Sequence, residues 1–444
     1  MAEFFLTDLQ IGLVSIAAIL IFIYAGMHVS IALALTSFIG VFLIRGNWTI
    51  ATKLLSLAAA DSISKYIFGV VPLFVLMGLL ISVSDIGKDM FDVANRIFRR
   101  IRGGLGVATV VANAVFAAVT GISIASAAVF TKVAVPEMMR LGYKPRFSVG
   151  VVTGSSVLGM LIPPSLLLIL FGVLTETSIG DLFTAGILPG LVLSTAYIIY
   201  ILVVAYFFPD YVQNSEVTTS AEVIEEMGLM TAGWKLLPIV TLIGLVLGGI
   251  YAGWFTPTES GAVGALGALL LALGKGRMSR SKLWQVLTET GHVTVAVLFL
   301  IISANIYGRM LALSGVTQFI GSWIAESGLG LYPLLTIYII VVLLMGTILD
   351  SSSILMIIVP LVHPVMLSMD VNLVWFGIIT IIAVEVGLLT PPLGIAAYVV
   401  KSTLDDQRIG LDDVFMGSAP FVLIMVLVLT LIVIFPSISL VLVK

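Results

Sequence analysis

Small hydroxyl-bearing residues interrupt two long apolar runs of this chain, and these residues are the best placed to do chemistry. One run carries TGISIAS at residues 120–126, and the other carries LDSSS at residues 349–353. Hydroxyl and carbonyl oxygens bind hard cations, whereas transition metals favour imidazole or thiolate ligands. The residues whose hydroxyl oxygens could bind such a cation are Ser123, Ser126, Ser351, Ser352 and Ser353, together with Thr390 of a later apolar run.

Two Pro-Pro pairs break other apolar runs, at LGMLIPPSLLL (158–168) and VGLLTPPLGIA (386–396). Each helix must unwind there, because proline lacks a backbone donor and clashes with the preceding turn. Unwound backbone at membrane depth is tolerated only where it is buried in protein or lines a cavity. Its free carbonyls suit a dehydrated Na⁺, and half-helix N-termini suit an anion. Such a pair of breaks predicts the midplane binding site of a secondary transporter.

Asp350 is a charged residue at the tip of the second polar interruption. An intramembrane carboxylate is costly and is functional by default. It could be a Na⁺ ligand, a proton carrier or the N-cap of the following helix. We interpret Glu385 and Glu259 as helix-start carboxylates that complement the helix dipole. We interpret Arg309 as an interfacial anchor, with a counter-charge for an anionic substrate as the alternative.

The composition is that of an integral membrane protein. Sixty per cent of residues are hydrophobic, 10% are charged, and the mean hydropathy is +1.21. The absence of cysteine excludes disulfides and thiolate metal sites, and three scattered histidines do not predict a zinc cluster. No basic patch with aromatic residues suggests nucleic-acid binding. GxSxG, HExxH and Walker motifs are also missing, so we expect neither an enzyme nor an ATP-driven pump.

Apolar runs of sufficient length predict the membrane segments. In a first repeat, residues 1–230, they are spans 9–26, 29–44 and 67–84, a hairpin at 105–139, a broken helix at 147–175 and a span at 182–207. In a second repeat, residues 231–444, they are spans 234–252, 259–274 and 291–312, a hairpin at 329–369, a broken helix at 373–403 and a span at 413–437. We expect residues 47–66 to form an interfacial amphipathic helix.

The repeats are predicted to be inverted. Basic residues flank the first hairpin on both sides, so we expect it to enter from and return to the cytoplasm, with a simple two-span hairpin as the alternative. The number of spans between the two hairpins then predicts that the second hairpin enters from and returns to the face opposite the cytoplasm. Fourteen of the 21 Lys and Arg residues fall in the loops that this topology makes cytoplasmic. Prolines at near-constant offset indicate a duplication: Pro136 and Pro360, Pro163 and Pro391, and Pro189 and Pro420.

Five stretches resemble the large membrane subunit of tripartite ATP-independent periplasmic (TRAP) transporters. They are FTPTESGAVGA (255–265), TGISIASAAVF (120–130), GMLIPPS (159–165), GTILDSSS (346–353) and GLLTPPLG (387–394). The resemblance implies an all-α polytopic protein of the elevator type, in the bacterial inner membrane. It implies Na⁺-driven import of an organic acid anion, a carboxylate or a sulfonate. It also implies two partners, a small four-helix membrane subunit and a periplasmic substrate-binding protein.

The resemblance also implies site residues, with Na⁺ as the coupling ion and no cofactor. The first sodium site would use Ser123, Ser126, Gly159 and Pro164. The second would use Gly346, Asp350, Ser351, Gly387 and Thr390. We take Ser155, Ser352, Ser353 and Pro391 as candidates for contact with the substrate. The alternatives are a Na⁺- or H⁺-coupled dicarboxylate symporter that needs no binding protein and, in another class, a membrane scaffold or enzyme without transport.

Overall fold

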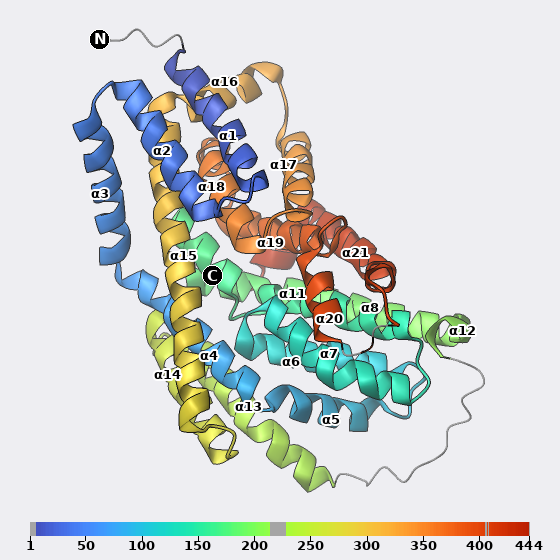
Figure 1. Ribbon diagram of the computed structural model, residues 1–444. Coiled ribbons are helices and arrows are strands. Elements are labelled where there is room, and N and C mark those ends of the chain that lie inside the picture. The colour runs from blue at the N-terminus through green and yellow to red at the C-terminus, as the bar shows by residue number, and fades with distance from the viewer. Residues whose placement is uncertain (1–5, 214–227, 405, 407, 444) are drawn as a thin grey trace.

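The structure, a computed structural model, describes residues 6–213, 228–404, 406 and 408–443, and its secondary structure is helical (Figure 1). Eight of the described helical segments are long and apolar enough to cross a membrane. They are Tyr66–Val83, Pro145–Thr175, Ile179–Phe207, Met230–Tyr251, Pro257–Gly274, Arg280–Ser314, Ser351–Ser368 and Leu411–Ile434. The predicted end of the first repeat at residue 230 adjoins residues 214–227, which lie outside the described part.

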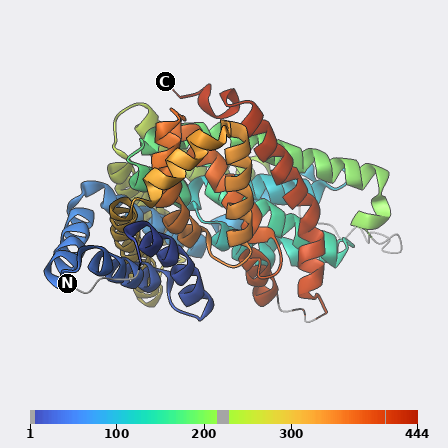
Figure 2. The same ribbon diagram turned by 90° about the horizontal axis from the view of Figure 1, so that it is seen from above.

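One group of helices contains α1 (Asp8–Tyr24), α2 (Val29–Arg45), α3 (Trp48–Ser64), α4 (Val70–Val83), α13 (Leu229–Tyr251), α14 (Pro257–Gly274) and α15 (Arg280–Ser314). Helix α2 packs along α15, and α4 packs along α14. Helix α3, the predicted interfacial helix, packs against both α2 and α15 (Figure 1). In the view from above, α1–α3 lie on one side of the molecule and α21 on the other (Figure 2).

The other group contains the hairpins and the broken helices. The first hairpin is α6 (Gly104–Thr120) and α7 (Ser123–Arg140), and the second is α17 (Leu331–Gly346) and α18 (Ser351–Ser368). The first broken helix is α8 (Pro145–Ser156), α9 (Leu158–Leu161) and α10 (Leu166–Thr175), and the second is α19 (Leu373–Leu389) and α20 (Ile395–Thr403). Helices α11 (Ile179–Phe207) and α21 (Leu411–Ile434) follow the two broken helices. The predicted fold class is therefore confirmed.

Each hairpin packs on the broken helix of its own half and also contacts the broken helix of the other half. The return arm of the first hairpin, α7, packs against α20 of the second half. The return arm of the second hairpin, α18, packs against α10 of the first half. Each half thus completes the broken helix of the other, which brings the tips and the breaks into one region.

Glycines allow a close helix contact in this second group, between α8 and α21. A methyl group placed on Gly150 would lie 2.2 Å from the backbone oxygen of Gly417. One placed on Gly417 would lie 2.2 Å from the backbone oxygen of Arg146. Small residues let membrane helices approach until their backbones touch, and van der Waals packing then holds them together.

Ion pairs connect the short helix α5 (Ile86–Phe98) and its N-cap residue Asp85 to the first group. Asp85 pairs with Arg277 at 2.8 Å, and Asp89 pairs with both Lys235, at 3.0 Å, and Lys275. The basic segment after α14 therefore lies beside α5, whose own segment is also basic. This is the grouping that the positive-inside prediction requires of two loops on one face.

Candidate functional site

The tip of the first hairpin lies directly against the first break. Gly121, in the left-handed region at φ +63°, accepts a hydrogen bond at its carbonyl oxygen from the backbone N–H of Leu166, at 3.2 Å. A methyl group on Gly121 would lie 2.4 Å from the carbonyl oxygen of Pro164. Only glycine combines this backbone conformation with so close an approach. The peptide bond between Pro163 and Pro164 is cis.

The second half repeats this arrangement. The backbone N–H of Leu393 donates to the carbonyl oxygen of Thr347 at 3.2 Å, and the peptide bond between Pro391 and Pro392 is cis. A methyl group on Gly346 would lie 2.5 Å from the Cα atom of Gly387. Hairpin tip and broken helix are therefore joined backbone to backbone in both halves.

The residues predicted for the first sodium site lie around the start of α7. A methyl group on Gly159 would lie 3.0 Å from the backbone nitrogen of Ser123, so α9 touches the hairpin tip. Ser123 and Ser126 are fully buried, and neither hydroxyl has a hydrogen-bond partner among the described residues. Buried hydroxyls are normally paired, so these two oxygens are unusual.

The residues predicted for the second sodium site lie around the start of α18. Asp350 is the N-cap of this helix, and its carboxylate accepts from the backbone N–H of Ser353 at 3.1 Å and from the Ser353 hydroxyl. The capping role predicted as one alternative is therefore confirmed. The Thr390 hydroxyl donates to the Val386 carbonyl at 2.7 Å.

A cavity of about 400 Å³ opens beside the Asp350 carboxylate. It is lined on one side by Asp350, Ser352 and Ser353, and on the other by residues of the α1–α2 connection and of α15. Two of the candidates for substrate contact, Ser352 and Ser353, thus share a cavity with a predicted sodium ligand.

The other two candidates for substrate contact lie elsewhere. Ser155 is buried within the packing of α8, where it donates to the Val151 carbonyl at 2.7 Å and accepts from Asn113 at 2.6 Å. Pro391 is exposed at the second break, whereas Pro163 and Pro164 of the first break are buried. The two breaks are therefore alike in backbone and different in exposure.

Glu385 does not lie at a helix start, so its interpretation as a dipole-complementing residue was wrong. It lies within α19 and is only 1% exposed. The Ser351 hydroxyl donates to its Oε1 atom at 3.0 Å, which ties α19 to the tip of the second hairpin. Glu259, by contrast, stands in the first turn of α14 and forms a capping box with Thr256, as the dipole interpretation requires.

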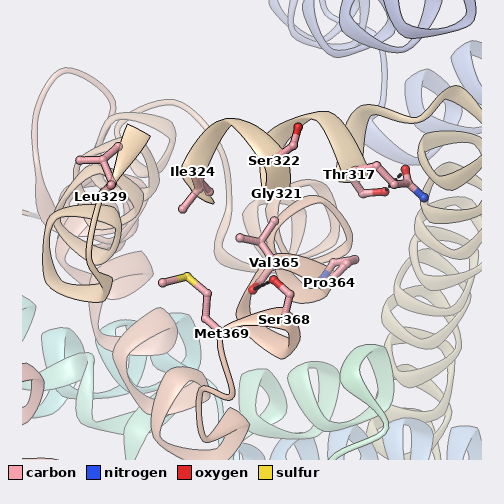
Figure 3. Close-up of a pocket in the computed structure, with 11 residues that line it drawn as sticks. Thr317, Gly321, Ser322, Ile324, Leu329, Pro364, Val365, Ser368 and Met369 are labelled. Carbon is pink, nitrogen blue, oxygen red and sulfur yellow. Dashed lines mark hydrogen bonds between the residues drawn. The ribbon is translucent and has the colours of Figure 1, made fainter. Parts of the chain in front are cut away.

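A larger cavity, of about 710 Å³, lies between α16 (Val316–Ser327) and the end of α18 (Figure 3). Its walls include Ile324, Leu329, Val365 and Met369, and it contains none of the predicted site residues. This larger cavity is thus separate from the region of the predicted oxygen ligands.

Charged pairs lie where α3 meets α10 and α15. Arg309 pairs with Asp61 at 2.5 Å, with 41% and 55% of their side chains exposed. Lys65, just after α3, pairs with Glu176, just after α10, at 2.7 Å. This second pair joins the first helix group to the second.

The Lys65–Glu176 pair should make a small, pH-dependent contribution to stability. The hydrogen bond and positive charge of Lys65 lower the pKa of the Glu176 carboxyl. The stabilisation is therefore present above the ordinary carboxyl pKa and is lost as the pH falls through the lowered one. Both side chains are more than half exposed, at 52% and 77%, so we expect at most about 1 kcal/mol.

Melting curves of the wild type and of Glu176→Gln would measure this contribution. The difference in melting temperature should be present at pH 7, should shrink as the pH falls below the ordinary carboxyl pKa of about 4.3, and should vanish only below the lowered pKa of Glu176. Glu326→Gln, an exposed acid in α16, is the matched control and should show no such difference. A Glu176→Gln difference that persists at low pH would contradict the ion-pair explanation.

Comparisons with known proteins place this geometry in a family. The family model of the tripartite ATP-independent periplasmic transporter, DctM component, matches residues 16–438. The C4-dicarboxylate TRAP transporter large permease protein DctM of Pseudomonas aeruginosa is 31% identical over 391 residues, which are 88% of this chain and 89% of that protein. The sialic acid TRAP transporter large permease protein SiaM of Vibrio cholerae is 29% identical, over 95% of each chain.

A solved structure is similar in fold. The YdaH transporter of Alcanivorax borkumensis superposes with a TM-score of 0.59 at 12% identity, and the alignment covers 89% of this chain and 90% of that one. The family model covers nearly the whole chain and includes both hairpins and both breaks. The chain therefore belongs to the tripartite ATP-independent periplasmic transporter family, as its DctM component, a multi-pass protein of the bacterial inner membrane.

Proposed function

We propose that this chain imports an organic acid anion and that a Na⁺ gradient drives the import. The observation that carries the proposal is the meeting of a hairpin tip and a helix break in both halves. In the first half, the buried hydroxyls of Ser123 and Ser126 have no hydrogen-bond partner among the described residues. Oxygen-only surroundings at unwound helices suit Na⁺. The family is ATP-independent by its description, so an ion gradient is the natural energy source.

The cavity beside Asp350 supports an anionic substrate. Ser352 offers a hydroxyl donor there, whereas the Ser353 hydroxyl donates to Asp350. Both residues lie in the first turn of α18, whose N-terminus carries partial positive charge. Relatives are described as transporting C4-dicarboxylates and sialic acid, which share a carboxylate. Transport leaves the anion chemically unchanged, so this function needs no catalytic residues.

The partners in this proposal are a small four-helix membrane subunit and a periplasmic binding protein that delivers the substrate. The tripartite description of the family supports both partners and disfavours a symporter that works without a binding protein. We further propose that residues 1–230 and 231–444 are the two repeats, and that the hairpin group moves against the α1–α4 and α13–α15 group as an elevator.

Sodium coupling can be tested on the purified chain before its substrate is identified. The melting temperature would be followed while choline is replaced by Na⁺ or by K⁺ at constant ionic strength. A ligand at a hundred times its dissociation constant stabilises a protein by about 2.7 kcal/mol. We expect Na⁺ to raise the melting temperature and K⁺ to leave it unchanged. Equal effects of the two ions would reject sodium coupling.

A further inference from the structure

Glu385 is a buried carboxylate, and one of its two oxygens has no hydrogen-bond partner among the described residues. Its Oε1 atom accepts from Ser351, but its Oε2 atom has no hydrogen-bond partner among the described residues. The side chain is 1% exposed, in the C-terminal part of α19, whose sequence contains no other charged residue. A buried carboxylate with an unpaired oxygen is costly, so something in the functioning protein should compensate it.

The fold itself does not require a carboxylate at this position. When the two Pro-Pro breaks are aligned, Pro163 with Pro391, Glu385 corresponds to Val157 of the first half. Val157 is likewise 1% exposed, so the same place in the repeat accepts an aliphatic side chain. Packing therefore does not explain why the second half has glutamate.

The surroundings of Glu385 come from both hairpins. Ser351 belongs to the second hairpin, and Ser123, of the first, is close enough to interact with the same carboxylate. Tyr197 of α11, whose buried hydroxyl has no partner among the described residues, also interacts electrostatically with Glu385. The geometry of Ser123 falls short of a hydrogen bond, so its hydroxyl remains unpartnered. No lysine or arginine among the described residues acts on this carboxylate. The junction is thus rich in oxygen and lacks a positive charge.

We propose that Glu385 is a ligand of a hard monovalent cation held between the two hairpin tips, with Ser123 and Ser351 contributing hydroxyl oxygens. This third position lies between the two predicted sodium sites, sharing Ser123 with the first and Ser351 with the second, and Glu385 is the ligand that belongs to neither. It rests on the proposed sodium coupling. The cation neutralises the buried carboxylate and occupies the lone pairs that the protein leaves open. It also connects the tips of both hairpins through α19, so its binding depends on both halves.

Equilibrium binding of radioactive Na⁺ to the purified chain would test this third position. The wild type should saturate at one more Na⁺ per chain than Glu385→Gln. The variant keeps an acceptor for Ser351 and nearly the same volume, and it removes an uncompensated buried charge, so its melting temperature in choline should equal or exceed that of the wild type. Its Na⁺ midpoint in melting experiments should rise roughly 10-fold or more. Glu326→Gln is the control and should change neither quantity.

Two failures can be told apart. Unchanged Na⁺ binding in Glu385→Gln, with a wild type that does bind Na⁺, would overturn this inference alone. A wild type that binds no Na⁺ would overturn the proposed sodium coupling and this position with it. If Glu385→Gln does not fold, Glu385→Asp replaces it in the test. Aspartate keeps the negative charge but is shorter by one methylene group, so its carboxylate lies farther from the proposed cation. That variant should then bind the last Na⁺ more weakly, and wild-type affinity would count against the inference.

Discussion

Gly150→Ala should destabilise the protein strongly, although it adds a single methyl group. That methyl would lie 2.2 Å from the backbone oxygen of Gly417, so α8 and α21 would have to separate. Overpacking of this kind costs about 1–3 kcal/mol and sometimes more. We expect a clear fall in melting temperature and loss of uptake in proteoliposomes, because α8 leads directly into the first break.

Gly248→Ala is the matched control for this substitution. Gly248 lies inside α13, and a methyl group there would meet nothing within 4 Å. Alanine favours helix over glycine by about 1 kcal/mol, so this variant should melt at or slightly above the wild-type temperature. If Gly150→Ala melts together with Gly248→Ala, the close contact of α8 with α21 is wrong.

Asp350→Asn should raise the Na⁺ concentration needed for half-maximal stabilisation by roughly 100-fold, the upper end of what changes around metal sites cost. Asparagine still offers an oxygen to the Ser353 N–H, so the cap of α18 and the melting temperature in choline should persist. Asp350→Ala removes both functions. It should lose the Na⁺ response and, in addition, about 1 kcal/mol of stability from the missing cap.

Asn47→Ala separates capping from ion binding. Asn47 caps α3 by accepting from the backbone N–H groups of Thr49, at 2.9 Å, and Ile50, at 3.2 Å. Its loss should cost as much stability as a lost cap elsewhere but should leave the Na⁺ midpoint unchanged. If the Na⁺ midpoint of Asp350→Asn also stays at the wild-type value, Asp350 acts as a cap and not as an ion ligand.

The helices and their interruptions could be predicted because their causes are local. The Pro-Pro pairs cannot continue a helix, and both breaks occur where these pairs stand. The small polar runs at residues 120–126 and 349–353 both became hairpin tips. Predicted and observed ends differ mainly for α15, which starts at Arg280 rather than at residue 291. The first turns of α15 carry charged residues, so a span predicted from hydropathy alone begins only after them.

The surroundings of the site could not be predicted, because they depend on contacts between distant segments. Arg309 and Asp61 are 248 residues apart, and nothing local indicates that they pair. Glu385 is different, since a signal was available. It is the one charge in an apolar run, which is the argument applied to Asp350. Its closeness to the second break favoured a dipole explanation that the position within α19 excludes.

The unequal exposure of the two breaks has a consequence for the transport cycle. Both halves join the hairpin tip to the break by a backbone hydrogen bond, yet the prolines of the first break are buried and those of the second are exposed. We therefore expect that the first break can adopt the exposed conformation of the second, and the second break the buried conformation of the first. Exchanging the two conformations would seal the break at Pro391 and open the break at Pro163. In the proposed transport cycle, this exchange would present the ions and the substrate to the opposite compartment, and the proposed duplication would account for the second state.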